Sequence, residues 1–184
     1  MRGGKRYTSL VPAQLDRLAA LIDLESQDSG IIAALQSFDA ILIGGQLPNP
    51  ATLESLKSRG VKLVESYGMA ETSGGCVYDG QALEGVNLEI IDGQVAVSRP
   101  VLANGIGEKF LSSDLGEIVN GRLKIIGRAD RVIVSGGKKV SLDDVEARVA
   151  AEEGVTEVIA VALDSKWGQA VRCLLHTSPS PRDP

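Results

Sequence analysis

Cysteine and histidine are scarce in this sequence, and their scarcity removes several kinds of chemistry. Cys76 and Cys173 lie far apart without a Cys-x-x-Cys partner, so we expect two reduced thiols rather than a disulfide framework or a thiolate zinc site. His176 is the single histidine, which excludes Ser-His or Cys-His nucleophiles and a multi-histidine metal site. Any reaction must therefore use carboxylates, lysine, arginine, hydroxyls and backbone amides.

The chain also lacks a surplus of basic residues and a long apolar run. Its formal charge of -5 and pI near 5.0 argue against nucleic acid as a partner, although a small anionic ligand remains open. No apolar run approaches the roughly 20 residues that span a bilayer, and the basic start, residues 1–8, has no apolar segment behind it. We therefore expect a cytoplasmic protein without a membrane partner; 184 residues suffice for one sizeable core or for one domain plus part of another.

In the first third of the chain, helical and strand patterns alternate. Helices are predicted over residues 12–24, with Ser9 as a cap, over 31–37 and over 50–59, and buried strands over 40–43 and 61–64. Strand, helix and strand in this order predict a βαβ crossover with parallel strands. Loops starting at Gly44 and at Glu65 would then lie at the carboxyl ends of neighbouring strands, where open α/β sheets bind ligands.

Two further patterns follow. Short alternating strands over 86–91, 94–98, 115–119 and 122–126, separated by Asp92-Gly93 and Asn120-Gly121, predict hairpins. After Gly127 we predict a strand over 131–134, a turn at 136–137, a helix over 141–152 capped by Ser141, and strands over 155–163 and 171–175. Residues 176–184 contain three prolines and no apolar residue, so we expect a non-native or disordered tail outside any sheet.

The segment from Glu65 to Thr72 combines an aromatic ring, a glycine, an acid and hydroxyls after a strand. An aromatic face can stack on a nucleobase, glycine lets backbone approach a ligand, and a carboxylate with hydroxyls can hold Mg²⁺ or phosphate oxygens. A solvent loop with one buried tyrosine is the alternative.

This segment resembles the Tyr-Gly-x-Thr-Glu motif of the adenylate-forming enzymes, a superfamily of acyl-CoA synthetases, peptide-synthetase adenylation domains and luciferases. The resemblance implies that Tyr67, with Ser66, Gly68 and Met69, borders the adenosine and that Glu71 helps to bind Mg²⁺. Ala70 stands where the motif has Thr, which puts that phosphate contact in doubt; we expect Thr72 to substitute for it.

Two more elements follow the order of the family. Gly44, Gly45 and Gln46 resemble the glycine turn beside the adenine and acyl pocket, although a Gly-Gly pair alone is most often only a turn. Phe110 to Gly116 resembles the Thr-Gly-Asp-Leu element, which implies that Asp114 accepts hydrogen bonds from both ribose hydroxyls. An isolated Asp before a strand is more often a turn residue.

Gly127 to Asp130 and the loop after it resemble the hinge region of the family. The resemblance implies that Asp130 is the hinge residue, that Arg128 contacts ribose or phosphate, and that Gly136 lets the pantetheine of CoA pass close to the backbone. Lys138 stands where the family often has a catalytic cation, beside Glu71 and Thr72 as the other expected catalytic residues. A β-turn with a solvated charge pair is the alternative for Lys138.

The fold implied is α/β: the C-terminal part of the large adenylate-forming domain, with a βαβ sheet and a small β-subdomain of hairpins, and then the start of the small α+β C-terminal domain. We place the partial AMP-binding domain at 1–126, the hinge at 127–131, the partial C-terminal domain at 132–175 and the tail at 176–184.

The string from Ser66 to Gly80 resembles more narrowly the actinobacterial ligases that join o-succinylbenzoate to CoA in menaquinone biosynthesis, as do residues 8–15. This implies ATP or AMP, Mg²⁺ and CoA as ligands; homo-oligomerisation stays open. Two family elements, a phosphate loop ending in Pro-Lys and a terminal Gly-Lys, are not found, so we expect an inactive piece of such a ligase. Another adenylate-former, or a non-catalytic nucleotide-binding fragment, is the alternative. The ligase hypothesis requires Tyr67, Asp114 and Arg128 to converge on one adenosine phosphate.

Overall fold

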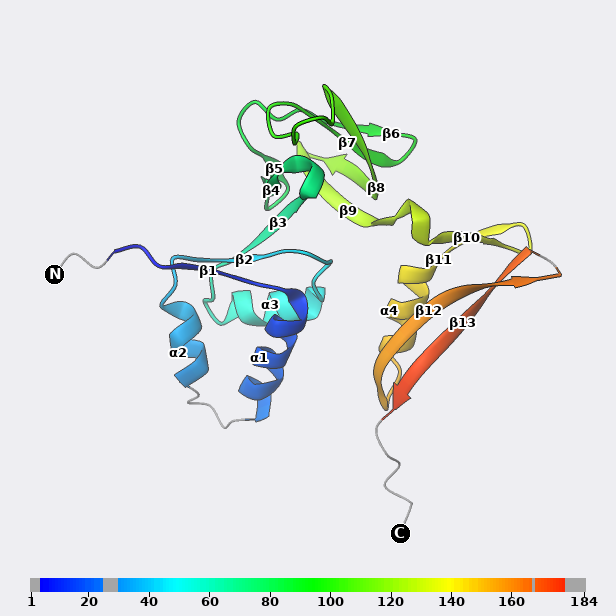
Figure 1. Cartoon of the computed structure of the whole chain (residues 1–184). Coiled ribbons are helices and arrows are strands. Elements are labelled where there is room, and N and C mark those ends of the chain that lie inside the picture. The colour runs from blue at the N-terminus through cyan, green and yellow to red at the C-terminus, as the bar shows by residue number, and fades with distance from the viewer. Residues whose placement is uncertain (1–3, 25–29, 167, 178–184) are drawn as a thin grey trace, which may run out of the picture. The chain divides into compact units, whose positions relative to one another are not determined.

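The computed structural model describes residues 4–24, 30–166 and 168–177 (Figure 1). The chain divides into two compact units. Unit 1 comprises Met1–Ser112 and Glu117–Ile125, and unit 2 comprises Ser113–Gly116 and Ile126–Pro184. The domain boundaries and the hinge at 127–131 expected above stay a prediction.

Unit 1 begins with a mixed sheet in the order β1-β2-β3-β4-β5. Its strands are β1 (Tyr7–Leu10), β2 (Ala40–Ile43), β3 (Leu63–Met69), β4 (Gly74–Tyr78) and β5 (Gln81–Ala82). The first three strands are parallel, whereas β3, β4 and β5 pair antiparallel. Helices α1 (Pro12–Leu24), α2 (Gly30–Gln36) and α3 (Pro50–Ser58) lie on the same side of β1 and β2 (Figure 1).

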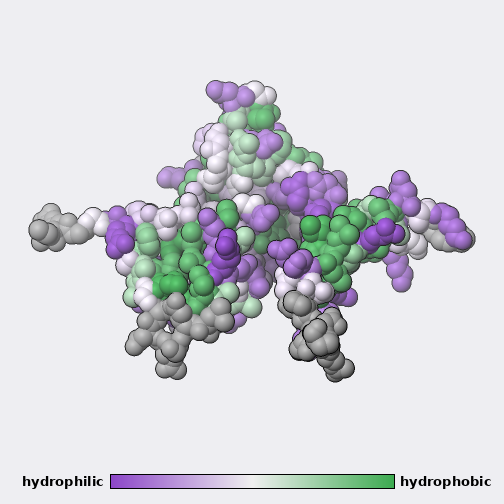
Figure 2. Space-filling view, turned by 60° about the horizontal axis from the view of Figure 1, so that its bottom comes forward, coloured by the Kyte–Doolittle hydropathy of each residue, from purple (hydrophilic) through white to green (hydrophobic). Residues whose placement is uncertain are grey.

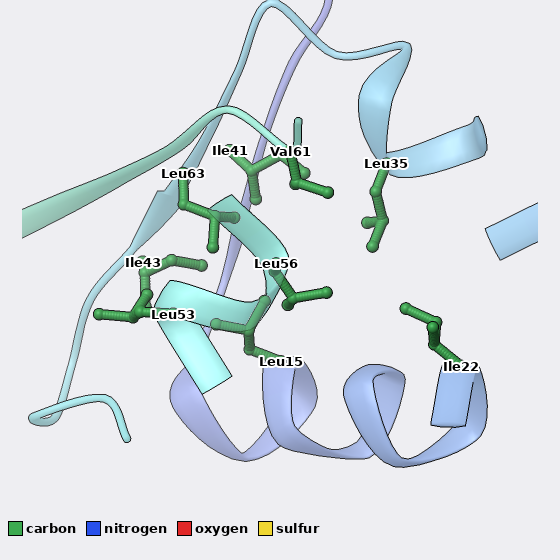
Figure 3. Close-up of a cluster of buried hydrophobic side chains, with 9 residues drawn as sticks. All are labelled: Leu15, Ile22, Leu35, Ile41, Ile43, Leu53, Leu56, Val61 and Leu63. Atoms are coloured by element: carbon green, nitrogen blue, oxygen red, sulfur yellow. The ribbon is translucent and has the colours of Figure 1, made fainter. Parts of the chain in front are cut away.

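Local chemistry sets the ends of these helices. In α3, Pro50 occupies the first turn, where a missing N–H costs nothing, and the Asn49 side chain accepts a hydrogen bond from the Ala51 N–H. The apolar faces of the helices and the sheet then meet in one cluster (Figure 3). Its buried members are Leu15, Ile22, Leu35, Ile41, Ile43, Leu53, Leu56, Val61 and Leu63.

A second, four-stranded sheet follows in the order β6-β7-β8-β9, with strands β6 (Leu88–Ile91), β7 (Gln94–Ser98), β8 (Lys109–Val119) and β9 (Arg122–Arg128). Asp92-Gly93 and Asn120-Gly121 have positive φ at both residues, as a type I′ hairpin turn requires. A second core cluster joins residues of this sheet to Cys76 and Val77 of β4. Its buried members are Cys76, Val77, Val86, Val95, Val97 and Leu123.

Unit 2 contains a sheet in the order β11-β10-β13-β12, made of β10 (Val132–Ser135), β11 (Lys138–Ser141), β12 (Val155–Ser165) and β13 (Gly168–Thr177). Helix α4 (Leu142–Ala150) packs against β12 and is capped by the Ser141 hydroxyl, which accepts from the Asp144 N–H at 3.1 Å. The described core is small, with Ile133, Leu142 and Ala160 buried.

An ion-pair cluster supports this small core. Arg131, from the 3₁₀ turn η2 (Ala129–Arg131), pairs with Asp143 and, at 2.6 Å, with Glu146 of α4. Glu146 in turn accepts a hydrogen bond from the Ala160 N–H of β12 at 2.7 Å. One arginine therefore fixes α4 to the turn that enters the sheet, and Glu146 fixes α4 to β12.

Most predicted elements are confirmed: the helix over 12–24, the parallel βαβ unit, the two hairpin turns and the Ser141 cap. The Ser9 cap is wrong because Ser9 lies in β1; the Val11 N–H instead donates to the Gln14 side chain. The loop expected from Glu65 is also wrong, because β3 continues to Met69 by pairing with β4.

The tail prediction fails at its first residues. His176 and Thr177 belong to β13, where His176 pairs with Glu157 and its carbonyl accepts from the Thr156 hydroxyl at 2.7 Å. A strand can extend past its apolar residues where a partner strand is available, as β12 is here. Residues 178–184 lie outside the described residues.

Both units leave apolar side chains at the surface, visible as green areas in Figure 2. In unit 2 these are Ile126, Val134, Ile159, Leu163, Leu174 and Leu175. No helix among the described residues is long and apolar enough to cross a membrane.

Candidate functional site

A cavity of about 500 Å³ lies in unit 1, beside the carboxyl ends of β1 and β2 and along β3 and β4. Predicted site residues from two distant segments line it together: Gly44 and Gly45 after β2, and Ser66, Gly68 and Met69 in β3. The volume is in the range of small-molecule sites, and its place is where open α/β sheets bind ligands.

Two glycines in this lining have no room for a side chain. A Cβ on Gly44 would lie 2.4 Å from the Ser66 hydroxyl, which donates to the Ile43 carbonyl at 3.1 Å. A Cβ on Gly68 would lie 2.0 Å from the Gly74 carbonyl oxygen. Backbone therefore forms part of the cavity wall, which lets a ligand approach it closely.

Tyr67 points elsewhere. Its hydroxyl lies 3.3 Å from the Ser112 hydroxyl of β8, and its ring packs on the second core cluster, which includes Val77. Gln46 is exposed in the segment after Gly45. Neither lines the cavity, so the adenine contact of Tyr67 stays a prediction.

The turn between β3 and β4 is built around Thr72 of the 3₁₀ turn η1 (Ala70–Thr72). Its hydroxyl accepts from the Met69 N–H at 2.9 Å and lies 2.7 Å from the Gly74 carbonyl. Thr72 is only 2% exposed. This geometry favours a role for Thr72 in bracing the turn over the phosphate contact that we expected. The two hydrogen bonds also hold the turn that contains Glu71.

Burial raises the pKa of the Cys76 thiol, and a hydrogen bond with Thr72 partly opposes this effect. Cys76 is completely buried, so its thiol is a core group. Cys76 forms no disulfide, in agreement with the expectation of a reduced thiol.

Among the described residues no group of three or more His, Cys, Asp or Glu side chains could hold a metal ion. Mg²⁺ in nucleotide sites is commonly held by one or two carboxylates with phosphate and water as the other ligands. Glu71 is partly buried, and its backbone carbonyl accepts a hydrogen bond from the Ala103 N–H at 2.8 Å. Its single carboxylate fits this way of binding Mg²⁺.

Unit 2 brings Asp114, Arg128 and Asp130 together. One guanidinium nitrogen of Arg128 lies 3.2 Å from Asp114, and its Nε donates to Asp130 at 2.9 Å. The hydrogen bond from Arg128 lowers the pKa of Asp130, and the same bond raises the pKa of Arg128. The Asp114 side chain is 17% exposed, so an acceptor and a permanent cation stand side by side at a partly open position.

Gly136 and Gly137 form the turn of the β10–β11 hairpin, with φ of 55° and 79°. No atom lies within 4 Å of a Cβ built on Gly136, so this side of the turn is open. Lys138 follows at the start of β11 and is exposed. The roles expected for Gly136 and Lys138 stay predictions.

Three polar side chains of the cavity lining were missed by sequence reasoning: Ser9, Gln14 and Tyr78. Tyr78 faces Ser66 across the β3–β4 ladder, a register that depends on a bulge between Tyr67 and Gly68. The sequence signal that could have pointed to Gln14 is its polar side chain in an otherwise apolar first turn of the helix.

No protein-family model matches the chain. A probable 2-succinylbenzoate–CoA ligase of Mycobacterium tuberculosis is 37% identical over 184 residues, covering 91% of this chain and 46% of that protein. The 2-succinylbenzoate–CoA ligase of Escherichia coli is 27% identical over 90% of the chain and 39% of its own length. The chain thus spans about half or less of the length of these relatives.

Solved structures agree with these relatives. Escherichia coli MenE with a bound phenylether-linked analogue of OSB-AMS superposes with a TM-score of 0.69 at 25% identity, covering 98% of this chain and 43% of that one. Bacillus subtilis MenE, an o-succinylbenzoate CoA synthetase in complex with AMP, has a TM-score of 0.74 at 22% identity and supports the fold alone, over 96% and 42% of the two chains. By sequence and fold together, the chain belongs to the adenylate-forming acyl-CoA synthetase superfamily.

Proposed function

We propose that the chain is part of a cytoplasmic ligase that activates o-succinylbenzoate with ATP and transfers the acyl group to CoA. The observation that carries this proposal is the cavity in which the Gly44-Gly45 turn and the β3 residues Ser66, Gly68 and Met69 meet. Relatives and neighbours that cover nearly the whole chain act on or bind o-succinylbenzoate derivatives, according to their names.

The described residues divide the work of the first half-reaction. The glycine-walled cavity would take the flat, uncharged parts of the acyl adenylate. Asp114, an acceptor with two oxygens, would take the ribose hydroxyls, and Arg128 would offset phosphate charge. Bound Mg²⁺, held by Glu71 and the phosphates, would supply charge neutralisation during adenylation.

The second half-reaction requires CoA to reach the acyl adenylate. Asp130 would be the hinge between the adenylating and thioester-forming poses, because a few residues between elements absorb such a rotation. Gly136, with open space at its α-carbon, would let pantetheine pass, and the exposed Lys138 would supply a cation.

AMP binding measured by calorimetry tests the proposal. Asp114→Asn removes an ionised acceptor, which is worth about 1.5–3 kcal/mol, so we expect at least tenfold weaker binding. Gly44→Ala should also weaken binding, because the new methyl group displaces Ser66. Gly30→Ala is the matched control, since nothing lies within 4 Å of its Cβ. A wild-type chain that binds no AMP, or variants that bind it equally well, would refute the proposal.

Turnover is a separate measurement. The sequence has no Pro-Lys phosphate loop and no terminal Gly-Lys of the family type, so we expect little pyrophosphate release from the 184-residue chain with o-succinylbenzoate, ATP, Mg²⁺ and CoA. A panel of aliphatic and aromatic acids in the same assay would identify a different adenylate-former.

A further inference from the structure

Among the residues that the structure describes, none with a cationic or carboxylate side chain lines the unit 1 cavity. Its polar side chains are neutral: Ser9, Gln14, Ser66 and Tyr78, among Leu, Val, Met and Gly. Neutral donors with apolar walls suit an aromatic or acyl group that carries oxygen acceptors, whereas a phosphate would leave its charge unbalanced.

A hydrogen bond orients the exposed side chain of Gln14 in this lining. Its side-chain Oε1 accepts a hydrogen bond from the Val11 N–H at 3.1 Å at the start of α1. The amide oxygen is therefore committed to the helix end, and the Nε2 group, with two donors, has no partner among the described residues. That group is available to an oxygen acceptor in the cavity.

Tyr78 is the aromatic member of the lining. Its hydroxyl lies 3.4 Å from the Gly75 carbonyl, a long contact that a ligand oxygen can replace at little cost. A Cβ on Gly75 would lie 2.6 Å from that hydroxyl, so the ring keeps this position because residue 75 is glycine. The half-buried ring can lie against an aryl group while its hydroxyl donates.

We propose that Gln14 and Tyr78 are specificity-determining residues that recognise the acyl part of the substrate, an aromatic acid with a second oxygen acceptor distant from the reacting carboxylate. This inference rests on the proposed function and deepens it. Tyr78 would contact the aryl ring, and the Gln14 amide with the Tyr78 hydroxyl would donate to the distant acceptor.

The test compares two ligands by calorimetry: AMP, which has no acyl group, and the sulfamoyl adenosine analogue acylated with o-succinylbenzoate. Gln14→Glu keeps an acceptor for the Val11 N–H but replaces the donor with a carboxylate. Tyr78→Phe removes only the hydroxyl. Both should weaken binding of the acylated analogue about tenfold, Gln14→Glu more than Tyr78→Phe, and leave AMP within about twofold.

Matched controls lie outside the cavity: Asn104→Asp adds the same charge at an exposed position, and Tyr7→Phe removes the hydroxyl of a tyrosine that is 61% exposed. Equal losses for AMP and the analogue, or no loss for the analogue, would overturn the inference and leave the proposed function standing. Failure of the wild-type chain to bind AMP would defeat the proposed function instead. In that case, binding of free o-succinylbenzoate tests the acyl site. Binding that Gln14→Glu weakens supports the acyl site, and absent or unchanged binding overturns it.

Discussion

Units 1 and 2 are held together in different ways. Unit 1 has two apolar clusters, one that includes the parallel strands and one that includes the hairpins, whereas the described core of unit 2 has three buried residues. Unit 2 adds the partly exposed cluster of Arg131, Asp143 and Glu146. Apolar burial is insensitive to pH, while charge pairs near water are screened and titrate. The cavity lies in the unit with the larger cores.

The largest expected effect comes from opening the larger core. Leu56→Ala removes a side chain that is 1% exposed and should destabilise unit 1 by about 2–5 kcal/mol, with unit 2 unaffected. Denaturant unfolding followed by hydrogen exchange in each unit checks this. Leu47→Ala, at a position 56% exposed, is the control. Equal losses of protection in both units would contradict the independence of the two cores.

A smaller effect is expected from the charge cluster of unit 2. Glu146→Gln removes the charge paired with Arg131 and weakens the bond to the Ala160 N–H, which should cost about 1–3 kcal/mol in unit 2. Glu153→Gln, an exposed position in the segment after α4, is the control. If denaturant unfolding of unit 2 gives the same stability as in the wild type, the ion pairs of the cluster contribute no more than ordinary surface ion pairs.

The two cysteines report on the two units. Cys76 is buried with a raised pKa, and Cys173 is partly exposed in β13. Under native conditions we expect iodoacetamide to modify Cys173 at least about tenfold faster, the ratio given by a difference of about 1.4 kcal/mol. Peptide mass spectrometry measures both rates. Faster modification of Cys76 would contradict the stronger burial in unit 1.

The smallest effect concerns Asp130. Its pKa is lowered from 3.8 because Arg128 donates to it, so its contribution to stability is present above about pH 3.8 and is lost as pH falls through the lower folded value. Carbon NMR of the carboxylate should give a midpoint below 3.8. In Arg128→Met the midpoint should return towards 3.8, and an unchanged midpoint would exclude the pairing.

Local patterns predicted much of this fold because each depends on neighbours in sequence. Helical spacing with Pro12 at the start placed α1, and Asp92-Gly93 and Asn120-Gly121 placed two hairpins. Strand β4 and the end of β3 were missed because their pairing depends on glycines that carry no pattern. The same is true of β11, whose Lys138 to Ser141 became a strand only by pairing with β10.

The strand end predicted the place of Gly44 in the cavity lining, whereas Ser66 lines the cavity from inside β3. The directions of the side chains could not be predicted from the sequence. Tyr67 turns towards Ser112 and the hydroxyl of Thr72 is taken up within its own turn, because those contacts depend on β4 and β8. Gln14 and Tyr78 enter the cavity from elements far apart in sequence, and no local pattern connects them.

The backbone walls of the cavity constrain how this protein can change. A new Cβ at Gly44, Gly68 or Gly75 would lie 2.4 Å from the Ser66 hydroxyl, 2.0 Å from the Gly74 carbonyl oxygen or 2.6 Å from the Tyr78 hydroxyl, so a replacement there displaces other residues of the lining. Drift towards bulkier substrates must therefore proceed through the aliphatic and aromatic positions, such as Leu42, Met69 and Tyr78, where atoms can be removed. Substitutions that enlarge the cavity are therefore available at positions with side chains and not at the three glycines.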